Sequence, residues 1–139
     1  MRIEIPSEKR FVHEMRMPIR WGDMDAYGHV NNTVYFRYME QARVEWITSL
    51  GYTVAPGSES MLMMNGFCNF YQQLTYPGEL ILKTFIGNIG RSSLDVYTSM
   101  ALSSAPEIEV AVGGATMVWV DLTSGKSAPW PEHVLSQLP

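Results

Sequence analysis

Residues Phe11 to Trp21 alternate between two kinds of side chain, which indicates a strand. One set is Phe11, His13, Met15, Met17, Ile19 and Trp21, and the other is Val12, Glu14, Arg16, Pro18 and Arg20. A period of two is typical of a half-buried β-strand. Because proline donates no ladder hydrogen bond, Pro18 predicts that this strand lies at a sheet edge or carries a bulge.

The next apolar pattern has helical spacing. Its positions recur every three or four residues and are Val34, Tyr35, Tyr38, Met39, Ala42, Trp46 and Leu50. This spacing predicts one long amphipathic helix. Asn31 or Asn32 can cap its first turn, and Gly51 marks its end. The density of aromatic residues predicts that most of its circumference is covered.

Four strand-like runs follow the helix, separated by turn signals at residues 76–78, 90 and 105–106. The predicted strands are Met61–Thr75, Leu80–Ile89, Ser92–Leu102 and Glu107–Leu122, and a short helix is expected over Glu132–Leu138. One strand, a long helix and then four strands favour an α+β fold with an antiparallel sheet curled around the helix. The length of 139 residues fits a single domain, 1–139.

The composition indicates a cell compartment and argues against some binding partners. The chain has 10 Lys and Arg and 14 Asp and Glu, so its net charge is −4. A negative net charge disfavours binding to nucleic acid. Cys68 is the only cysteine, so no internal disulfide forms and a reducing cytoplasm suits the chain. No apolar run approaches the ~20 residues of a membrane span, and residues 1–11 lack the apolar core of a secretory signal. We therefore expect a soluble cytoplasmic protein with no nucleic-acid or membrane partner.

Residues 21–32 hold the densest chemistry of the chain: two carboxylates, an imidazole, two amides and two glycines before a helix. A helix N-terminus can polarise a carbonyl, and a nearby carboxylate can attack the carbonyl carbon or activate water there. The alternative is structural, since aspartates before a helix often shape turns and caps. Both interpretations stay open for Asp23 and Asp25, and His29 is equally explained as a hydrogen-bonding loop residue.

The run from Arg20 to Phe36, RWGDMDAYGHVNNTVYF, resembles the opening motif of the 4-hydroxybenzoyl-CoA thioesterase family in the hotdog superfamily. The resemblance combines the paired aspartates, the Gly-His-Val-Asn-Asn segment and Tyr35, and a weaker similarity extends over most of the chain. It implies a hotdog fold, in which an antiparallel β-sheet wraps one long central α-helix. It also implies that two subunits join their sheets, as a homodimer or homotetramer with substrate between chains.

The resemblance also assigns roles. The family's catalytic carboxylate falls on Asp25, as nucleophile or general base, and its carbonyl-polarising backbone amide falls near Asn32. Some relatives have histidine at the position of Asn32, so no side-chain role carries over to it. His29 and Tyr35 are candidate substrate contacts. The turn before Leu94 matches one that meets the nucleotide of coenzyme A, so Arg91, Ser92 and Ser93 are candidate contacts, with a solvated turn as the alternative.

The expected activity is hydrolysis of an acyl-coenzyme A thioester to the free acid and coenzyme A, with no cofactor or metal. Coenzyme A is then part of the substrate. Alternatives within the fold are a thioesterase for acyl carrier protein, a hydratase or dehydratase using Glu40 or Glu45, and a non-catalytic module that binds acyl thioesters.

Other hydrolytic chemistries fit poorly. Residues 90–94 lack the second glycine of a nucleophile elbow, and the three histidines show no metal-ligand spacing. Cys68 lies between Phe67 and Phe70, where a buried structural thiol is the usual explanation. An adaptable apolar pocket is a further expectation, with plain core as its alternative; its candidate lining is Met61, Met63, Met64, Phe67 and Phe70.

Overall fold

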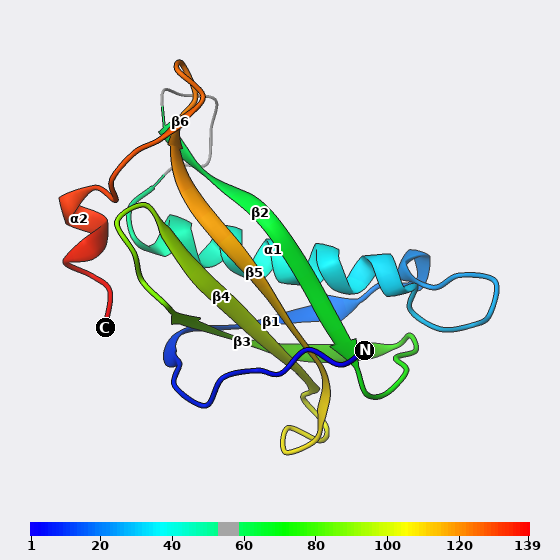
Figure 1. Ribbon diagram of the computed structural model, residues 1–139. Coiled ribbons are helices and arrows are strands. Elements are labelled where there is room, and N and C mark those ends of the chain that lie inside the picture. Colours follow the sequence, from blue (N-terminus) through cyan, green and yellow to red (C-terminus); the bar gives the residue numbers. More distant parts are fainter. Residues whose placement is uncertain (53–58) are drawn as a thin grey trace.

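The computed structural model describes residues 1–52 and 59–139. Along the chain these residues form a sheet, one long helix and two short helical turns (Figure 1). The elements are β1 (Arg10–Ile19), the 3₁₀ turn η1 (Trp21–Asp23), α1 (Asn32–Ser49), β2 (Glu59–Phe70), β3 (Gly78–Gly87), β4 (Ser93–Leu102), β5 (Glu109–Asp121), β6 (Lys126–Ser127) and α2 (Glu132–Leu135).

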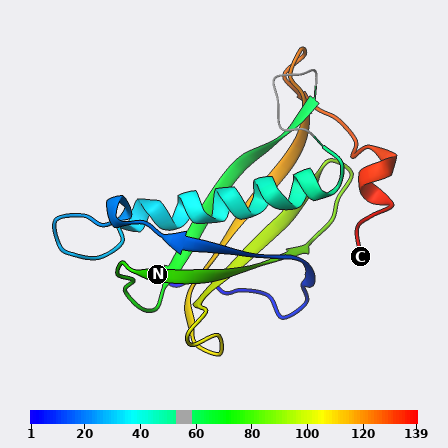
Figure 2. The same ribbon diagram turned by 180° about the vertical axis from the view of Figure 1, so that it is seen from behind.

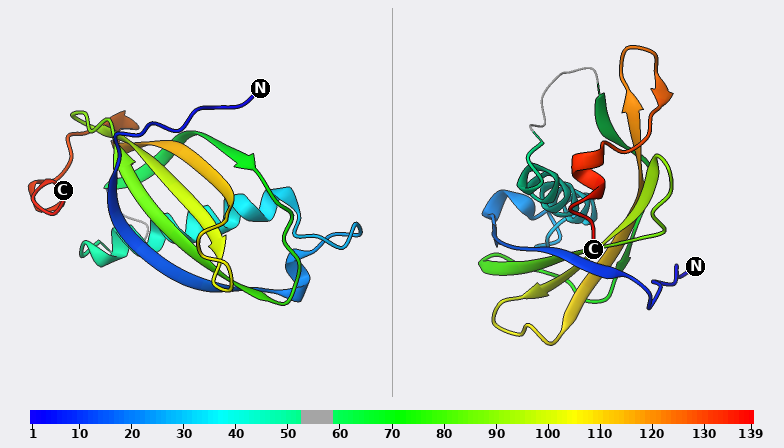
Figure 3. Two further views of the ribbon diagram at one scale, coloured as in Figure 1. Left: turned by 90° about the horizontal axis from the view of Figure 1, so that it is seen from below. Right: turned by 90° about the vertical axis from the view of Figure 1, so that its left-hand side faces the viewer.

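All strand pairings are antiparallel, and the strand order is β1-β3-β4-β5-β2, with β6 paired to β5. Helix α1 lies across one face of this sheet, as Figure 2 shows. An end-on view shows the sheet curving past the helix (Figure 3). The α+β prediction of an antiparallel sheet curled around one long helix is confirmed. No helix in the described ranges is both long and apolar enough to cross a membrane.

Strand β1 lies at one edge of the sheet, as Pro18 predicted. It pairs with β3, and Pro18 stands opposite Glu79. The irregularity in this pairing falls between Phe11 and His13 rather than at Pro18. An edge strand needs ladder hydrogen bonds on one side only, so proline is tolerated without a bulge.

Helix α1 buries one face against the sheet through Tyr35, Tyr38, Met39, Ala42, Trp46 and Ile47. Its opposite face stays in solvent, where Phe36 is 37% exposed. The prediction that most of the circumference is covered is therefore wrong for the single chain, because one sheet layer contacts only one side of the helix.

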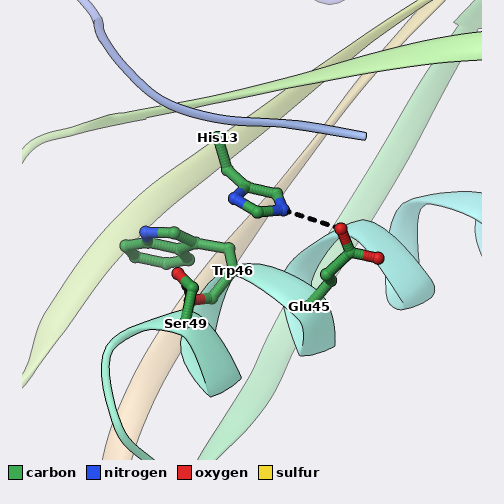
Figure 4. A network of polar contacts seen from close by, with 4 residues as sticks. All are labelled: His13, Glu45, Trp46 and Ser49. Atoms are coloured by element: carbon green, nitrogen blue, oxygen red, sulfur yellow. Dashed lines mark hydrogen bonds and ion pairs between the residues drawn. The ribbon is translucent and has the colours of Figure 1, made fainter. Parts of the chain in front are cut away.

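Two features fix α1 against the strands. A Cβ at Gly113 of β5 would overlap Met39 Sδ and lie 2.7 Å from the backbone oxygen of Phe67, so glycine permits the close approach of helix and sheet. Near the other end of the helix, His13 Nε2 of β1 lies 3.0 Å from Glu45 Oε1, beside Trp46 (Figure 4).

The predicted strand Met61–Thr75 is wrong at its end, since β2 stops at Phe70. The N–H groups of Tyr71 and Gln72 both donate to Val110 O, at 2.9 and 3.0 Å, and this shared acceptor ends the ladder. The short pair β5–β6 and η1 were not predicted, and α2 ends at Leu135 rather than Leu138.

Strand β2 is the second edge of the sheet. Its register shifts between Met63 and Asn65, and among the described residues it pairs only with β5. Three large apolar side chains stand exposed at its middle, namely Leu62 at 45%, Met63 at 50% and Met64 at 65%. An unpaired apolar edge of this kind is a ready surface for another strand.

Candidate active site

The loop between η1 and α1 projects beyond the N-terminus of the helix (Figure 1). Met24 and Val30 pair as an isolated antiparallel bridge, and Asp25 N–H donates to His29 O at 3.0 Å. Gly28 has φ of 80°, a left-handed conformation that glycine adopts without strain, and its N–H donates to Asp25 O at 3.0 Å. The loop is therefore a closed, internally bonded structure.

Each carboxylate oxygen of Asp25 accepts one hydrogen bond. Oδ1 accepts from Tyr27 N–H at 2.9 Å, and Oδ2 accepts from Asn31 Nδ2 at 2.9 Å. The Asn31 amide and then the Tyr27 N–H lower the pKa of Asp25 below its ordinary value. Burial opposes them by less, and the nearby His29 lowers the pKa by the least. Asp25 is thus an ionised carboxylate at neutral pH.

The start of α1 is capped by Asn31, one of the two predicted caps. Its Oδ1 accepts from Thr33 N–H at 2.9 Å and from Thr33 Oγ1 at 2.5 Å. In the described part of the chain, the backbone N–H of Asn32 finds no acceptor. A free N–H at a helix N-terminus carries partial positive charge and can bind an oxygen with negative charge.

Asp23 has a structural environment that differs from that of Asp25. Its Oδ2 accepts from Arg20 N–H at 2.9 Å and from Tyr38 OH at 2.6 Å, and its backbone oxygen accepts from Asn31 N–H. Burial, and then the Asp23 carboxylate, raise the pKa of Tyr38, so the phenol keeps its proton and remains a donor. Asp23 therefore anchors the loop to α1. This agrees with the structural interpretation of Asp23 rather than with the catalytic one.

Most predicted site residues meet in one groove of about 470 Å³. Asp25, His29, Asn32 and Tyr35 all line it, together with Tyr27, Val30, Asn31, Phe70, Tyr71, Gln72 and Gln73. Tyr35 is buried; its OH donates to Gln72 O at 3.3 Å, and its ring packs edge-on against Phe70 at 4.9 Å. A carboxylate and a free helix N–H thus share one open groove.

The predicted coenzyme A contacts lie elsewhere in the chain. Arg91 and Ser92 lie in the β3–β4 turn and Ser93 begins β4, at the far end of the sheet from the Asp25 loop (Figure 1). Backbone bonds hold this turn: Trp119 N–H donates to Ser92 O at 2.7 Å, and Trp130 N–H to Arg91 O at 3.0 Å. Within one chain the turn does not meet Asp25, so its role stays a prediction.

A second cavity, of about 240 Å³, lies between the C-terminal half of α1 and the first half of β2. Met61 and Met63 line it, as expected of an apolar pocket, beside Val44, Ile47, Met117 and Trp119, with Glu40, Arg43 and Glu59 among the polar lining. The other proposed lining residues differ. Phe70 lines the Asp25 groove, Met64 is exposed, and Phe67 lines a cavity with Asp95 and Tyr97 on the sheet face away from α1.

The rival catalytic groups are occupied or unreactive. Glu40 pairs with Arg37 at 2.6 Å and Glu45 with His13 at 3.0 Å, and neither lines the Asp25 groove. Burial raises the pKa of Cys68 to about 12, so its thiol stays protonated and poorly nucleophilic.

Two residues that the sequence did not assign to the site shape it: Asn31, which bonds Asp25, and Tyr38, which bonds Asp23. The capping position of Asn31 could have indicated this role. A capping asparagine uses its Oδ1 for the helix, so its Nδ2 group remains free to bond another residue. For Tyr38 the helical period indicated burial alone, and nothing local connects it to Asp23.

Comparison with known proteins identifies relatives across nearly the whole chain. The sequence profile of the Thioesterase-like superfamily matches residues 19–138. The PA2801 protein of Pseudomonas aeruginosa, named as a candidate thioesterase, is 31% identical and superposes with a TM-score of 0.88, covering 91% of this chain and 98% of its own. A gentisyl-coenzyme A thioesterase, BH1999, has a TM-score of 0.82 at 19% identity, over 91% of this chain and 100% of its own, and so shares the fold.

A plant relative is more distant. The acyl-acyl carrier protein thioesterase ATL3 of Arabidopsis thaliana is 26% identical over 113 residues, which are 78% of this chain and 58% of ATL3. Together with the sheet, the helix and the extent of the profile match, these findings show that the chain belongs to the thioesterase-like superfamily and has its hotdog fold.

Proposed function

We propose that this protein hydrolyses an acyl-coenzyme A thioester, with Asp25 as its catalytic carboxylate. The observation that carries the proposal is the placing of an ionised Asp25 and the free Asn32 N–H in one groove. The opening motif favours the branch of the superfamily typified by 4-hydroxybenzoyl-CoA thioesterase.

The reaction needs two groups at one carbonyl. The Asn32 N–H donates to the thioester oxygen and stabilises the negative charge that develops there. Asp25 either attacks the carbonyl carbon, forming an anhydride that water then hydrolyses, or takes a proton from the attacking water. In both routes the C–S bond breaks, the thiolate leaves and takes up a proton, and one water molecule is consumed for each acid released.

Two copies of the chain complete the site in this proposal. The exposed edge of β2 pairs with the same edge of a second copy, antiparallel about a two-fold axis near mid-strand. Such pairing places the first half of one β2, with Met61 and Met63, beside the last half of the other, with Phe70. The apolar cavity of one copy then adjoins the Asp25 groove of its partner and takes the acyl group.

Thiol release tests the chemistry. Aromatic and fatty acyl-coenzyme A substrates are incubated with the wild type and with Asp25→Asn, and the free thiol is measured with a thiol-reactive dye. Loss of the carboxylate should lower kcat by at least about 100-fold while the fold persists. Asp121→Asn, at the last residue of β5 and outside the Asp25 groove, is the matched control and should keep full activity. Equal rates in wild type and Asp25→Asn would contradict the assignment.

Sedimentation tests the assembly. Met64→Lys puts a charge at the middle of the β2 edge without touching the groove of its own chain, and should shift the dimer toward monomer and lower activity together. A monomeric wild type would rule out the shared site.

A carrier-protein substrate is the second candidate, favoured by the ATL3 similarity. Release from acyl carrier protein in parallel with coenzyme A esters distinguishes them, because the preferred thiol carrier gives the larger kcat/KM.

A further inference from the structure

We infer that Asn31 is the positioning residue of this site, because one side-chain amide both caps helix α1 and holds the Asp25 carboxylate in place. The inference rests on the proposed catalytic role of Asp25. It assigns Asn31 a function that helix capping alone does not require.

The contacts of Asn31 leave its amide a single orientation. Oδ1 accepts both the N–H and the hydroxyl of Thr33, at 2.9 and 2.5 Å. The planar amide then directs Nδ2 to Asp25 Oδ2, 2.9 Å away. A flipped amide would set NH₂ against the Thr33 N–H donor and an oxygen against the carboxylate, so both contacts would become repulsive.

The backbone of Asn31 is fixed as well. Its N–H donates to Asp23 O at 3.0 Å, and its C=O accepts from Val34 N–H at 2.9 Å. Asn31 is therefore bonded at four points: to the turn before the loop, to the first turn of α1 twice, and to Asp25. Because Asn31 is fixed to the first turn of α1, its side chain fixes the position of the Asp25 carboxylate relative to the helix.

The fixed amide also lowers the pKa of Asp25. A donor bonded to a carboxylate favours its ionised form. The titratable groups that face Asp25 are Tyr27 and His29 on the loop, Tyr35 on α1 and Tyr71 after β2. Of these only His29 can bring a positive charge, and its effect on the pKa is smaller than that of Asn31.

Conservative variants separate capping from positioning. Asn, Asp and Ser cap helices about equally well, so a pure cap would tolerate either replacement. Asn31→Ser keeps a capping oxygen and loses the donor to Asp25. Asn31→Asp keeps size and cap, and sets a second carboxylate against Asp25.

The experiment follows Asp25 by two independent readouts. NMR measures the chemical shift of its carboxyl carbon across pH, and thiol release gives kcat/KM across pH. We expect the midpoint of Asp25 to rise in Asn31→Ser and to rise further in Asn31→Asp. We also expect kcat/KM at neutral pH to fall about tenfold or more, as for a misplaced catalytic group, in variants that remain folded at the assay temperature.

The outcomes separate this inference from the proposed function. If both variants titrate and turn over like the wild type, Asn31 only caps the helix and the inference is wrong. If Asp25→Asn keeps full thiol release, the catalytic assignment fails even where the NMR midpoints move, and the inferred catalytic positioning fails with it.

Discussion

Both ends of helix α1 pack in buried apolar clusters, but only the N-terminal end also carries a hydrogen-bonded loop. At the C-terminal end, Trp46 packs in a buried cluster with Trp119 and Trp130, each no more than 4% exposed. At the N-terminal end, the Asp25 loop lies outside the sheet and is held by hydrogen bonds from Asn31 and Tyr38. The contrast indicates that apolar packing fixes the helix itself, whereas polar bonds fix the loop that keeps a carboxylate and a free N–H in an open groove.

The largest expected effect removes the packing. Trp46→Ala deletes the helix's contribution to the tryptophan cluster and should lower the free energy of unfolding by about 3–5 kcal/mol. Urea denaturation measures the loss. Because Trp46 does not line the Asp25 groove, activity per folded molecule should stay near that of the wild type. A small loss of stability would mean that the tryptophan cluster does not anchor this end of the helix.

The second-largest expected effect comes from loosening the loop that carries Asp25. Tyr38→Phe removes the 2.6 Å bond to Asp23 and should cost about 1.5–3 kcal/mol, as for a hydrogen bond to a charged group. Unlike Trp46→Ala, it should also lower kcat per folded molecule, since the loop carries Asp25. Denaturation and thiol release on the same preparation test this pairing, and unchanged kcat would show that the Asp23 anchor is purely structural.

A pH titration examines the polar end without mutation. The pKa of Asp25 lies below its ordinary value, so thiol release should stay on its plateau through mildly acid pH. The sign for stability is the same: ionised Asp25 stabilises the fold above its unfolded-state pKa, and this contribution is lost as the pH falls through the lower folded-state pKa. An acid limb near pH 6 would contradict the assignment.

The smallest effect lies beside Trp46, in the partly exposed pair that links the C-terminal half of α1 to β1. Glu45→Gln removes the charge opposite His13 on β1, where the glutamate side chain is 43% exposed. A pair this open to solvent should contribute less than about 1 kcal/mol, and activity should not change. A larger loss on thermal or urea unfolding would make this pair a third anchor of the helix.

The sequence predicts the elements that depend on local periodicity. The alternation and the spacing from Val34 to Leu50 predicted β1 and α1 closely, because burial repeats regularly through the middle of each element. The alternation fails at its ends, where Phe11 is 53% and Trp21 74% exposed and Trp21 lies in η1. In strand β2 the periodic pattern does not continue along the whole strand. The register shift between Met63 and Asn65 moves later residues to the opposite face, so Phe67 lies against Gly114 and Tyr97 rather than in the expected pocket.

The site was predictable only in part, for a similar reason. The density of polar residues before α1 and the motif pointed to Asp25, and four of the predicted residues meet in its groove. The bond from Asn31 to Asp25 depends on how the loop folds back between Met24 and Val30, which no spacing encodes. The place of Arg91 against a substrate depends on a second chain, which one sequence cannot position.

Gly113 limits how this scaffold can be redesigned. The helix already rests on the β5 backbone, so any side chain at Gly113 would have to push Met39 aside and press on the Phe67 carbonyl. Adding a side chain to β5 at this position is therefore not a practical way to change the acyl preference proposed above. Mutational libraries should instead vary Met63, which lines the cavity proposed for the acyl group and is 50% exposed, so a change of volume meets solvent there.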